Sequence, residues 1–230
     1  MRKGFTLAEV LVVLAILGII AAITLPAINA QFVKSEVETG FKKFVSVLEN
    51  ANALLMNDKE CVNLDDAVGN TSGTSTWDKS KNYIAAISGY IGAQGGISDS
   101  VEYYDYYNGG SSLNIAQGSG SFYGSDSGTF AMYPRNAITG YYEVLADLNG
   151  YKKKPNALGR DLHLFVVEIE TGKVFGYGSQ KASVFRTGGA QAHDKWEDRC
   201  PNSIQVRPGN SAFSCAGSIM DNGGKIVYNW

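Results

Sequence analysis

The sequence predicts an α+β fold in which one long N-terminal helix, half transmembrane and half amphipathic, packs on a C-terminal antiparallel sheet. Three observations support this prediction. An uncharged apolar run of 19 residues extends from Val10 to Ile28, hydrophobic residues then recur at helical spacing up to Leu55, and several strand-like segments follow in the C-terminal half. A helix with one apolar stripe needs another element to cover that stripe, which a sheet supplies in an α+β layout.

The composition excludes several classes of function. Of 230 residues, 44% are hydrophobic and 18% are charged, which is enough apolar material for a folded core. The net charge of −2 excludes a generally basic nucleic-acid binder, so nucleic acid is not an expected partner. Two histidines and three cysteines leave little room for a zinc site. The sequence carries no common nucleophile or nucleotide-binding signature, so we expect no enzymatic activity and no required cofactor.

The N-terminal run is long enough to cross a bilayer as a helix, which takes about 20 residues. Arg2 and Lys3 precede it, and by the positive-inside rule they hold the N-terminus in the cytoplasm and send the rest of the chain across. Two alternatives stay open: a secretory signal peptide, for which Ala27 to Ala30 offers a crude cleavage site, and a plain signal anchor. A soluble core helix is disfavoured because both faces of the run are apolar.

Glu9 is the exceptional residue of this segment. A carboxylate within an apolar span costs about 2.5–3.5 kcal/mol on insertion scales and marks a functional site by default. No basic residue lies within the span. We therefore expect the partner of Glu9 to come from another chain, or from an α-amine that cleavage creates nearby.

Beyond Pro26 the helix is predicted to continue as an amphipathic segment. Its hydrophobic residues are spaced by three or four positions, which is typical of one helical stripe. The stripe consists of Val33, Val37, Phe41, Phe44, Leu48, Ala51 and Leu55. The helix from Phe5 to about Met56 would be about 75–80 Å long at 1.5 Å per residue. Gly40 lies within the stripe, where we interpret it as a point of close packing.

The globular part is predicted to contain the sheet. Glu170 to Gly172 has the pattern of a short hairpin turn, and the Gly/Ser-rich residues 108–128 are predicted to be loops that join short strands. A short helix is expected at Tyr83 to Ile87, and a turn followed by a last strand at Lys225 to Trp230 is expected after Cys215. The strand candidates are Thr129 to Tyr133, Tyr141 to Ala146, Leu162 to Ile169 and Lys173 to Tyr177.

The most patterned stretch of the globular part, residues 147–161, is a candidate calcium loop. Asp-x-Asn-Gly supplies oxygen ligands at alternate positions and a glycine for a sharp turn. Leu158 stands where an EF-hand has its bidentate Glu, so this loop is not an EF-hand. The alternative is an Asx-turn loop whose carboxylates accept hydrogen bonds from backbone N–H groups. The candidate ligands are Asp147, Asn149, Tyr151, Asn156 and Asp161.

The N-terminus resembles that of type IV prepilins and type II secretion pseudopilins. The resemblance rests on Lys3 to Ala21, with sequence KGFTLAEVLVVLAILGIIA, and on the following Thr24-Leu25-Pro26. It is strong over residues 1–55 and weak over the rest. It implies a leader at residues 1–4, the transmembrane and amphipathic helix at residues 5–58, and a pilin-like globular domain at residues 59–230.

The resemblance also implies how this N-terminus is processed and used. A prepilin peptidase would cut between Gly4 and Phe5 and methylate the new amine of Phe5. Glu9 would pair with that amine on a neighbouring subunit, and Pro26 would weaken or kink the helix. The implied partners are the peptidase, other pilin or pseudopilin subunits in a homo- or hetero-polymer, an inner-membrane assembly platform and the lipid bilayer.

Two features of the globular domain gain an interpretation from the resemblance. Many type IV pilins have a C-terminal disulfide loop, so we expect a bridge between Cys200 and Cys215, with Cys61 as the odd cysteine. Some major pseudopilins hold calcium in a C-terminal loop. Residues 147–161 resemble such a loop in the kind of residues they contain, but they do not share a sequence motif with it.

Two functions from different classes fit these observations. The first is a structural subunit of a type IV pilus or type II secretion pseudopilus. Such a subunit crosses the bacterial inner membrane once, with its N-terminus in the cytoplasm and its globular domain in the periplasm, and a pilus would carry it to the cell surface. The second is a membrane-anchored periplasmic binding module that recognises a ligand and does not polymerise. The N-terminus is common to pili and pseudopili and does not separate them.

Overall fold

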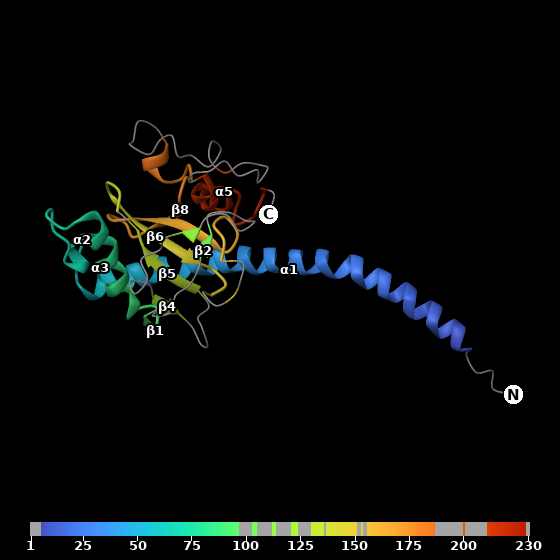
Figure 1. The fold of residues 1–230 in the computed structure, drawn as a ribbon. Helices are drawn as coiled ribbons and strands as arrows, with labels where there is room; N and C mark the ends of the chain where they lie inside the picture. Colours follow the sequence, from blue (N-terminus) through green and yellow to red (C-terminus); the bar gives the residue numbers. More distant parts are fainter. Residues whose placement is uncertain are drawn as a thin grey trace. The chain divides into compact units, whose positions relative to one another are not determined.

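The computed structural model describes residues 6–96, 103–104, 112–113, 121–123, 130–135, 137–150, 153, 156–186, 200 and 211–228. The chain divides into two compact units, Met1–Glu36 and Val37–Trp230. The first unit contains the N-terminal part of helix α1 (Leu7–Asp58), and the second contains the rest of α1 with all other helices and strands (Figure 1). The prediction of one long N-terminal helix followed by a sheet is therefore confirmed.

Among the described residues, six strands form an antiparallel sheet with the order β1-β4-β5-β6-β7-β8. The strands from β4 to β8 are neighbours in both sequence and space, so this part of the sheet is a meander. A separate antiparallel pair consists of β2 (Tyr103–Tyr104) and β3 (Ser112–Leu113). The bounds of the six strands are Ala93–Gly96 (β1), Ser121–Tyr123 (β4), Phe130–Pro134 (β5), Tyr141–Asp147 (β6), Leu162–Glu168 (β7) and Val174–Gly176 (β8).

The two central strands, β6 and β7, pair over seven residues, from Tyr141 opposite Glu168 to Asp147 opposite Leu162. Their side chains alternate between two hydrophobic clusters, one on each face of the sheet. Val144 and Phe165 belong to the cluster that includes α1, whereas Leu145, Leu164 and Val166 belong to the other. Because both faces are covered, β6 and β7 are apolar almost throughout and show little of the alternation of a half-exposed strand.

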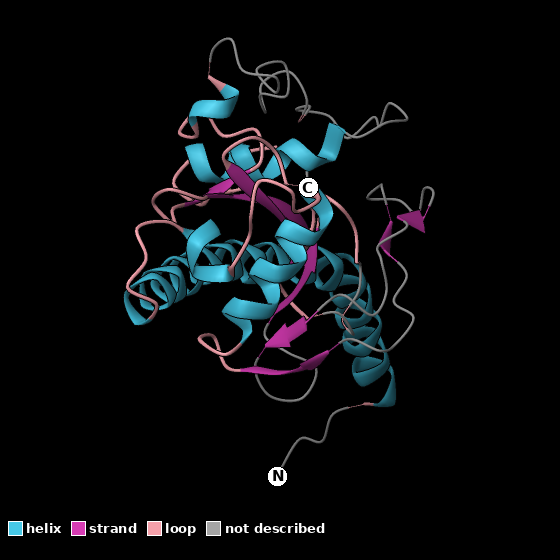
Figure 2. Cartoon of the chain, turned by 90° about the vertical axis from the view of Figure 1, so that its left-hand side faces the viewer, coloured by secondary structure: helices cyan, strands magenta, loops and turns pink. Residues whose placement is uncertain are grey.

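The amphipathic stripe of α1 covers the first of these faces. Within the globular unit its members are at most 2% exposed: Val37, Phe41, Phe44, Leu48, Ala51 and Leu55. The rings of Phe41 and Phe44 lie 5.0 and 4.6 Å from that of Phe165 on β7. Burial of each large side chain contributes about 1.5–3 kcal/mol, so this stripe is a major part of the core. Figure 2 shows the strands and the helices of this unit in a second view.

A buried asparagine joins α1 to two other parts of the globular unit. Asn52 Nδ2 donates to the carbonyl of Gly172 at 2.7 Å, in the turn between β7 and β8. The hydroxyl of Tyr83, on helix α3 (Thr76–Ser88), donates to Asn52 Oδ1 at 2.7 Å. Asn52 and Tyr83 are fully buried, so each group depends on the other for its hydrogen bond.

Replacement of Asn52 by alanine should lower the free energy of unfolding by about 2–3 kcal/mol, because it removes the buried hydrogen bonds to the Gly172 carbonyl and from the Tyr83 hydroxyl. Urea unfolding of the full chain in detergent micelles, followed by near-UV circular dichroism, measures the change. Asn50→Ala is the matched control, because Asn50 is exposed on the same helix. Equal stability of the two variants would show that Asn52 does not join these elements.

The structure corrects several predicted boundaries in the globular part. The expected helix at Tyr83 to Ile87 is the C-terminal part of the longer α3, which begins at Thr76 because the Ser75 hydroxyl caps it by accepting from Asp78 N. A further helix, α2 (Leu64–Val68), was not predicted, and neither were β1 and β4. Helix α2 has five residues and β4 has three, and β1 has no large hydrophobic side chain, so none of them gives a periodic signal.

The C-terminal prediction of a turn and a last strand was wrong. Residues Cys215–Asp221 form helix α5, preceded by a 3₁₀ turn at Ser211–Ser214, and the described residues 225–228 form no strand. Helix α5 is favoured because its residues 215–219 are buried against β8 and β7, where a helix satisfies its own backbone groups.

Candidate functional site

The N-terminal end of α1 holds the carboxylate of Glu9 against Thr6. The backbone N–H and the hydroxyl of Thr6 both donate to Glu9 Oε2 at 2.8 Å, and the Glu9 N–H donates to Thr6 Oγ1 at 3.2 Å. This reciprocal pair is a capping box, which the Thr-x-x-Glu spacing could have predicted. Within one chain Glu9 is thus satisfied by a neutral partner. Gly4 and Phe5, the predicted cleavage and methylation positions, lie outside the described residues.

The helix around Glu9 exposes apolar surface on all sides of the first unit. In the part of the chain that the structure describes, α1 is long and apolar enough to cross a membrane. None of its most apolar 18-residue stretch is buried within the chain. Its apolar side chains must therefore be covered by lipid or by other chains.

Pro26 lies inside α1, and the helix continues through it. A proline removes one backbone donor from the helical ladder, so the turn around residue 26 has fewer hydrogen bonds than its neighbours. Thr24 adds a second local perturbation, because its hydroxyl donates to the carbonyl of Ile20 at 2.9 Å. The structure thus combines an intact helix with a segment that is weaker than the rest.

The connection between β6 and β7 is organised by Asp161. Its two carboxylate oxygens accept hydrogen bonds from the backbone N–H groups of Asn156 at 2.8 Å and Ala157 at 2.7 Å. At the other end of the connection, Asp147 Oδ1 accepts from the backbone N–H of Asn149 at 3.2 Å. The predicted Asx-type hydrogen bonds are therefore present. Burial raises the pKa of Asp161, although the backbone N–H groups of Ala157 and Asn156 act in the opposite direction.

The candidate ligands of this loop come together in the fold, as far as they are described. Asp147, Asn149, Asn156 and Asp161 are all buried, whereas Tyr151 lies outside the described residues. In the described part of the chain, no three His, Cys, Asp or Glu side chains form a group that could hold a metal ion. A cation in this loop would therefore depend on two carboxylates together with amide and carbonyl oxygens.

The same loop contacts α1 at Gly40. A Cβ atom at Gly40 would lie 2.8 Å from the carbonyl oxygen of Leu148, the residue between Asp147 and Asn149. The interpretation of Gly40 as a point of close packing is therefore confirmed. The loop is also sharply turned at Gly150, whose φ of 94° favours glycine.

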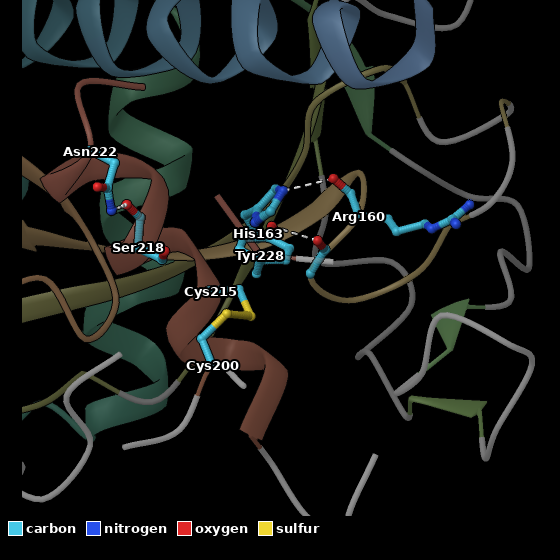
Figure 3. The surroundings of a disulfide bond; sticks show 8 residues. Arg160, His163, Cys200, Cys215, Ser218, Asn222 and Tyr228 are labelled. Carbon is cyan, nitrogen blue, oxygen red and sulfur yellow. Dashed lines mark hydrogen bonds between the residues drawn. A yellow bond between two sulfur atoms is a disulfide. The ribbon is translucent and has the colours of Figure 1, made fainter. Parts of the chain in front are cut away.

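A disulfide joins Cys200 to Cys215 at the start of α5, as the pilin resemblance implied (Figure 3). Both cysteines are only 4% exposed. Cys61 has a free thiol, whose Sγ lies 3.2 Å from the carbonyl of Lys59. The bridge therefore fixes the beginning of α5, while Cys61 lies just beyond the end of α1.

Two glycines let α5 approach β8 at backbone distance. A Cβ atom at Gly176 would lie 2.1 Å from the carbonyl oxygen of Ala216, and one at Gly217 would lie 2.4 Å from the backbone nitrogen of Ser179. The Gly217 N–H also donates to the carbonyl of Tyr177 at 2.9 Å. The helix is thus attached to the sheet edge through backbone atoms, an arrangement that sequence periodicity cannot reveal.

His163 is a structural residue at the start of β7. Its ring lies edge-on to Phe41 at 6.0 Å, and its Nε2 is 2.8 Å from the carbonyl oxygen of Arg160 (Figure 3). Burial lowers the pKa of His163 to about 4, although the Arg160 carbonyl acts in the opposite direction. The imidazole is therefore neutral near pH 7 and serves as packing between the sheet and α1.

Comparison with known protein families identifies a motif at the N-terminus of the chain. The family described as the prokaryotic N-terminal methylation motif matches residues 1–25. A type IV major fimbrial protein FimA of Dichelobacter nodosus is 34% identical over 92 residues, which cover 39% of this chain and 54% of that protein. A fimbrial protein of the same organism is 35% identical over 94 residues, with the same coverage of both chains. No solved structure matches significantly.

The similarity and the fold agree with one another. The chain spans about half the length of the curated relatives it matches. The matched motif contains the residues on which the predicted processing depends, and the long helix followed by an antiparallel sheet has the architecture that the resemblance implied. The chain therefore carries a prokaryotic N-terminal methylation motif and a disulfide-bonded α+β globular domain, and it is similar to type IV fimbrial proteins over part of its length.

Proposed function

We propose that the chain is a structural subunit of a type IV pilus. In this proposal a prepilin peptidase cleaves between Gly4 and Phe5 and methylates Phe5, and the processed subunit polymerises through α1. Before assembly the subunit resides in the inner membrane, with its N-terminus in the cytoplasm and its globular domain in the periplasm. The fimbrial names of the relatives favour a pilus over a type II secretion pseudopilus.

The observation that carries the proposal is a single carboxylate in the apolar and uncovered N-terminal part of α1. Glu9 lies within the matched motif, and within its own chain it bonds to the neutral Thr6. A methylated α-amine remains positively charged, so Phe5 of a neighbouring subunit would supply the counter-charge for Glu9 in a low-dielectric bundle. Bundling would also cover the apolar faces of the helices. Other pilin subunits and an inner-membrane assembly platform are the partners that this mode of assembly requires.

The processing step is tested by the intact mass of the protein from cells that express it at native level. Sheared surface material and the membrane fraction are analysed side by side. The proposal expects a chain of residues 5–230 with one added methyl group, present in the sheared fraction. An uncut chain, or one cut near Ala30, would contradict it. The processed chain confined to the envelope would point instead to a pseudopilin or to a membrane-anchored binding module.

Substitution of Glu9 by glutamine should abolish incorporation into filaments, because it removes the charge that pairs with the neighbouring amine and keeps the shape of the side chain. The amount of the protein in the sheared fraction should fall at least about tenfold, which corresponds to a loss of about 1.4 kcal/mol per subunit contact. Glu36→Gln is the control, because Glu36 lies on the same helix beyond the apolar run. Normal filaments from Glu9→Gln would contradict charge pairing as the basis of assembly.

A further inference from the structure

We propose that the loop between β6 and β7 binds one calcium ion through Asp147, Asn149, Asn156 and Asp161. The four side chains are 0%, 5%, 7% and 0% exposed, respectively. They are provided by the end of β6 and by the loop that follows it. This inference does not depend on the proposed function in filament assembly, because all four residues belong to the globular unit.

The side chains converge because Asn149 contacts both carboxylates. Its backbone N–H donates to Asp147 Oδ1 at 3.2 Å, and its side chain forms a hydrogen bond with Asp161. The backbone N–H of Asn156 donates to Asp161 Oδ2 at 2.8 Å. The backbone also brings the ends of the loop together, since Leu148 N donates to the carbonyl of Asp161 at 2.8 Å. The two carboxylates and two amides are thus parts of one cluster.

The amide of Asn149 provides an independent indication of a ligand. Its Oδ1 is buried and has no hydrogen-bond partner among the described residues. A buried amide oxygen without a partner is unfavourable, and rotation of the amide would only direct it toward the Asp161 carboxylate. A cation between these oxygens would satisfy both groups at once. The Asn149 side chain is therefore directed at Asp161 through its Nδ2, and rotation of the amide would present Oδ1 as a metal ligand.

The chemistry of the oxygens selects calcium. Calcium takes six to eight oxygen ligands from carboxylates, amides, backbone carbonyls and water in flexible geometry. Two carboxylates balance its charge of +2. The backbone N–H groups of Asn156 and Ala157 fix the position of the Asp161 carboxylate, and a bound cation would replace the hydrogen bond that this carboxylate accepts from the Asn149 side chain. The low count of carboxylates places the expected affinity among the weaker, extracellular calcium sites, with a Kd of about 10⁻⁴ to 10⁻³ M.

The test uses the full chain in detergent micelles after treatment with EGTA. Isothermal titration with CaCl₂ should show one ion bound per chain, and the unfolding temperature should rise with calcium concentration. Asn149→Ala should raise the Kd at least about tenfold, because it removes a neutral ligand and leaves both carboxylates in place. Asp147→Asn serves as a second variant if Asn149→Ala does not fold. Glu170→Gln removes an exposed carboxylate in the turn between β7 and β8, at the other end of β7, and should bind calcium as the unaltered chain does.

Three results would overturn the proposal. The first is the absence of binding heat and of any rise in unfolding temperature at about 10 mM CaCl₂, well above the expected Kd. The second is unchanged calcium affinity in both Asn149→Ala and Asp147→Asn, which would place the ion elsewhere. The third is an equal response to MgCl₂, because magnesium demands near-ideal octahedral geometry and a site that binds both ions equally would not be selective for calcium.

Discussion

Replacement of Gly176 by alanine is expected to destabilise the globular domain by about 3 kcal/mol or more. The new Cβ atom would lie 2.1 Å from the carbonyl oxygen of Ala216, 2.3 Å from its carbonyl carbon and 2.7 Å from the nitrogen of Gly217. All three are backbone atoms of α5, so no side-chain rotation can relieve the overlap. Helix α5 would have to move away from β8, and residues 215–219 would lose their burial.

The measurement is urea unfolding of the full chain in detergent micelles. Gly89→Ala is the matched control, because nothing lies within 4 Å of a Cβ atom at Gly89 and its φ of −66° suits alanine. That control should be neutral or slightly stabilising. Gly217→Ala should resemble Gly176→Ala. The double variant should cost less than the sum of the two, because either substitution alone separates the same pair of elements. A folded Gly176→Ala protein of unchanged stability would contradict the packing of α5 on β8.

The sequence predicted an element correctly where burial of one face leaves a periodic pattern of hydrophobic residues. The stripe from Val37 to Leu55 could be predicted because a single face of a helix is buried, and each of its residues in the globular unit is in the core. Strands β6, β7 and β8 were predicted within about one residue at each end. The Glu170 to Gly172 turn was also found, since Gly172 has a φ of 71° and its N–H donates to Glu168.

Other features were missed because they depend on contacts between distant parts of the chain. Helix α5 has little periodicity, and its glycine would ordinarily weaken a helix. The close approach of its Gly217 to the backbone of residues 177–179 explains why glycine stands there. In the sequence, Asn52 is simply a polar residue of α1. Its burial against Tyr83 and Gly172 is visible only in the fold. A glycine inside a predicted strand, as at Gly176, is the signal that could have suggested a close approach.

The candidate calcium loop was likewise predictable only in part. The spacing of Asp147, Asn149 and Asp161 predicted that oxygen atoms would gather there, and the fold brings these residues together. The sequence could not distinguish a carboxylate that caps backbone N–H groups from one that binds a cation. The structure contains the capping bonds to Asn156 and Ala157, and it adds the buried Asn149 oxygen that the pattern alone could not supply.

Loss of the disulfide is the second large effect that we expect. Replacement of both Cys200 and Cys215 by serine should lower the free energy of unfolding by about 3 kcal/mol, the value for a loop near the observed sequence separation of 15 residues. Urea unfolding of the full chain measures the loss. Cys61→Ser is the control and should leave stability unchanged, because Cys61 is a free thiol. Peptide mapping that joins Cys61 to either of the other cysteines would contradict this assignment.

The position of the bridge explains why its loss should be felt beyond its own loop. Cys215 begins α5, whose buried face is held on β8 by the close backbone contact of Gly176 with residues 216–217 and by the hydrogen bond from the Gly217 N–H to the Tyr177 carbonyl. The bridge therefore restrains the same helix that the glycine pair positions. Because both changes release α5, Gly176→Ala combined with the two serines should destabilise the domain by less than the sum of the separate effects. Full additivity would mean that the disulfide stabilises the domain without acting through α5.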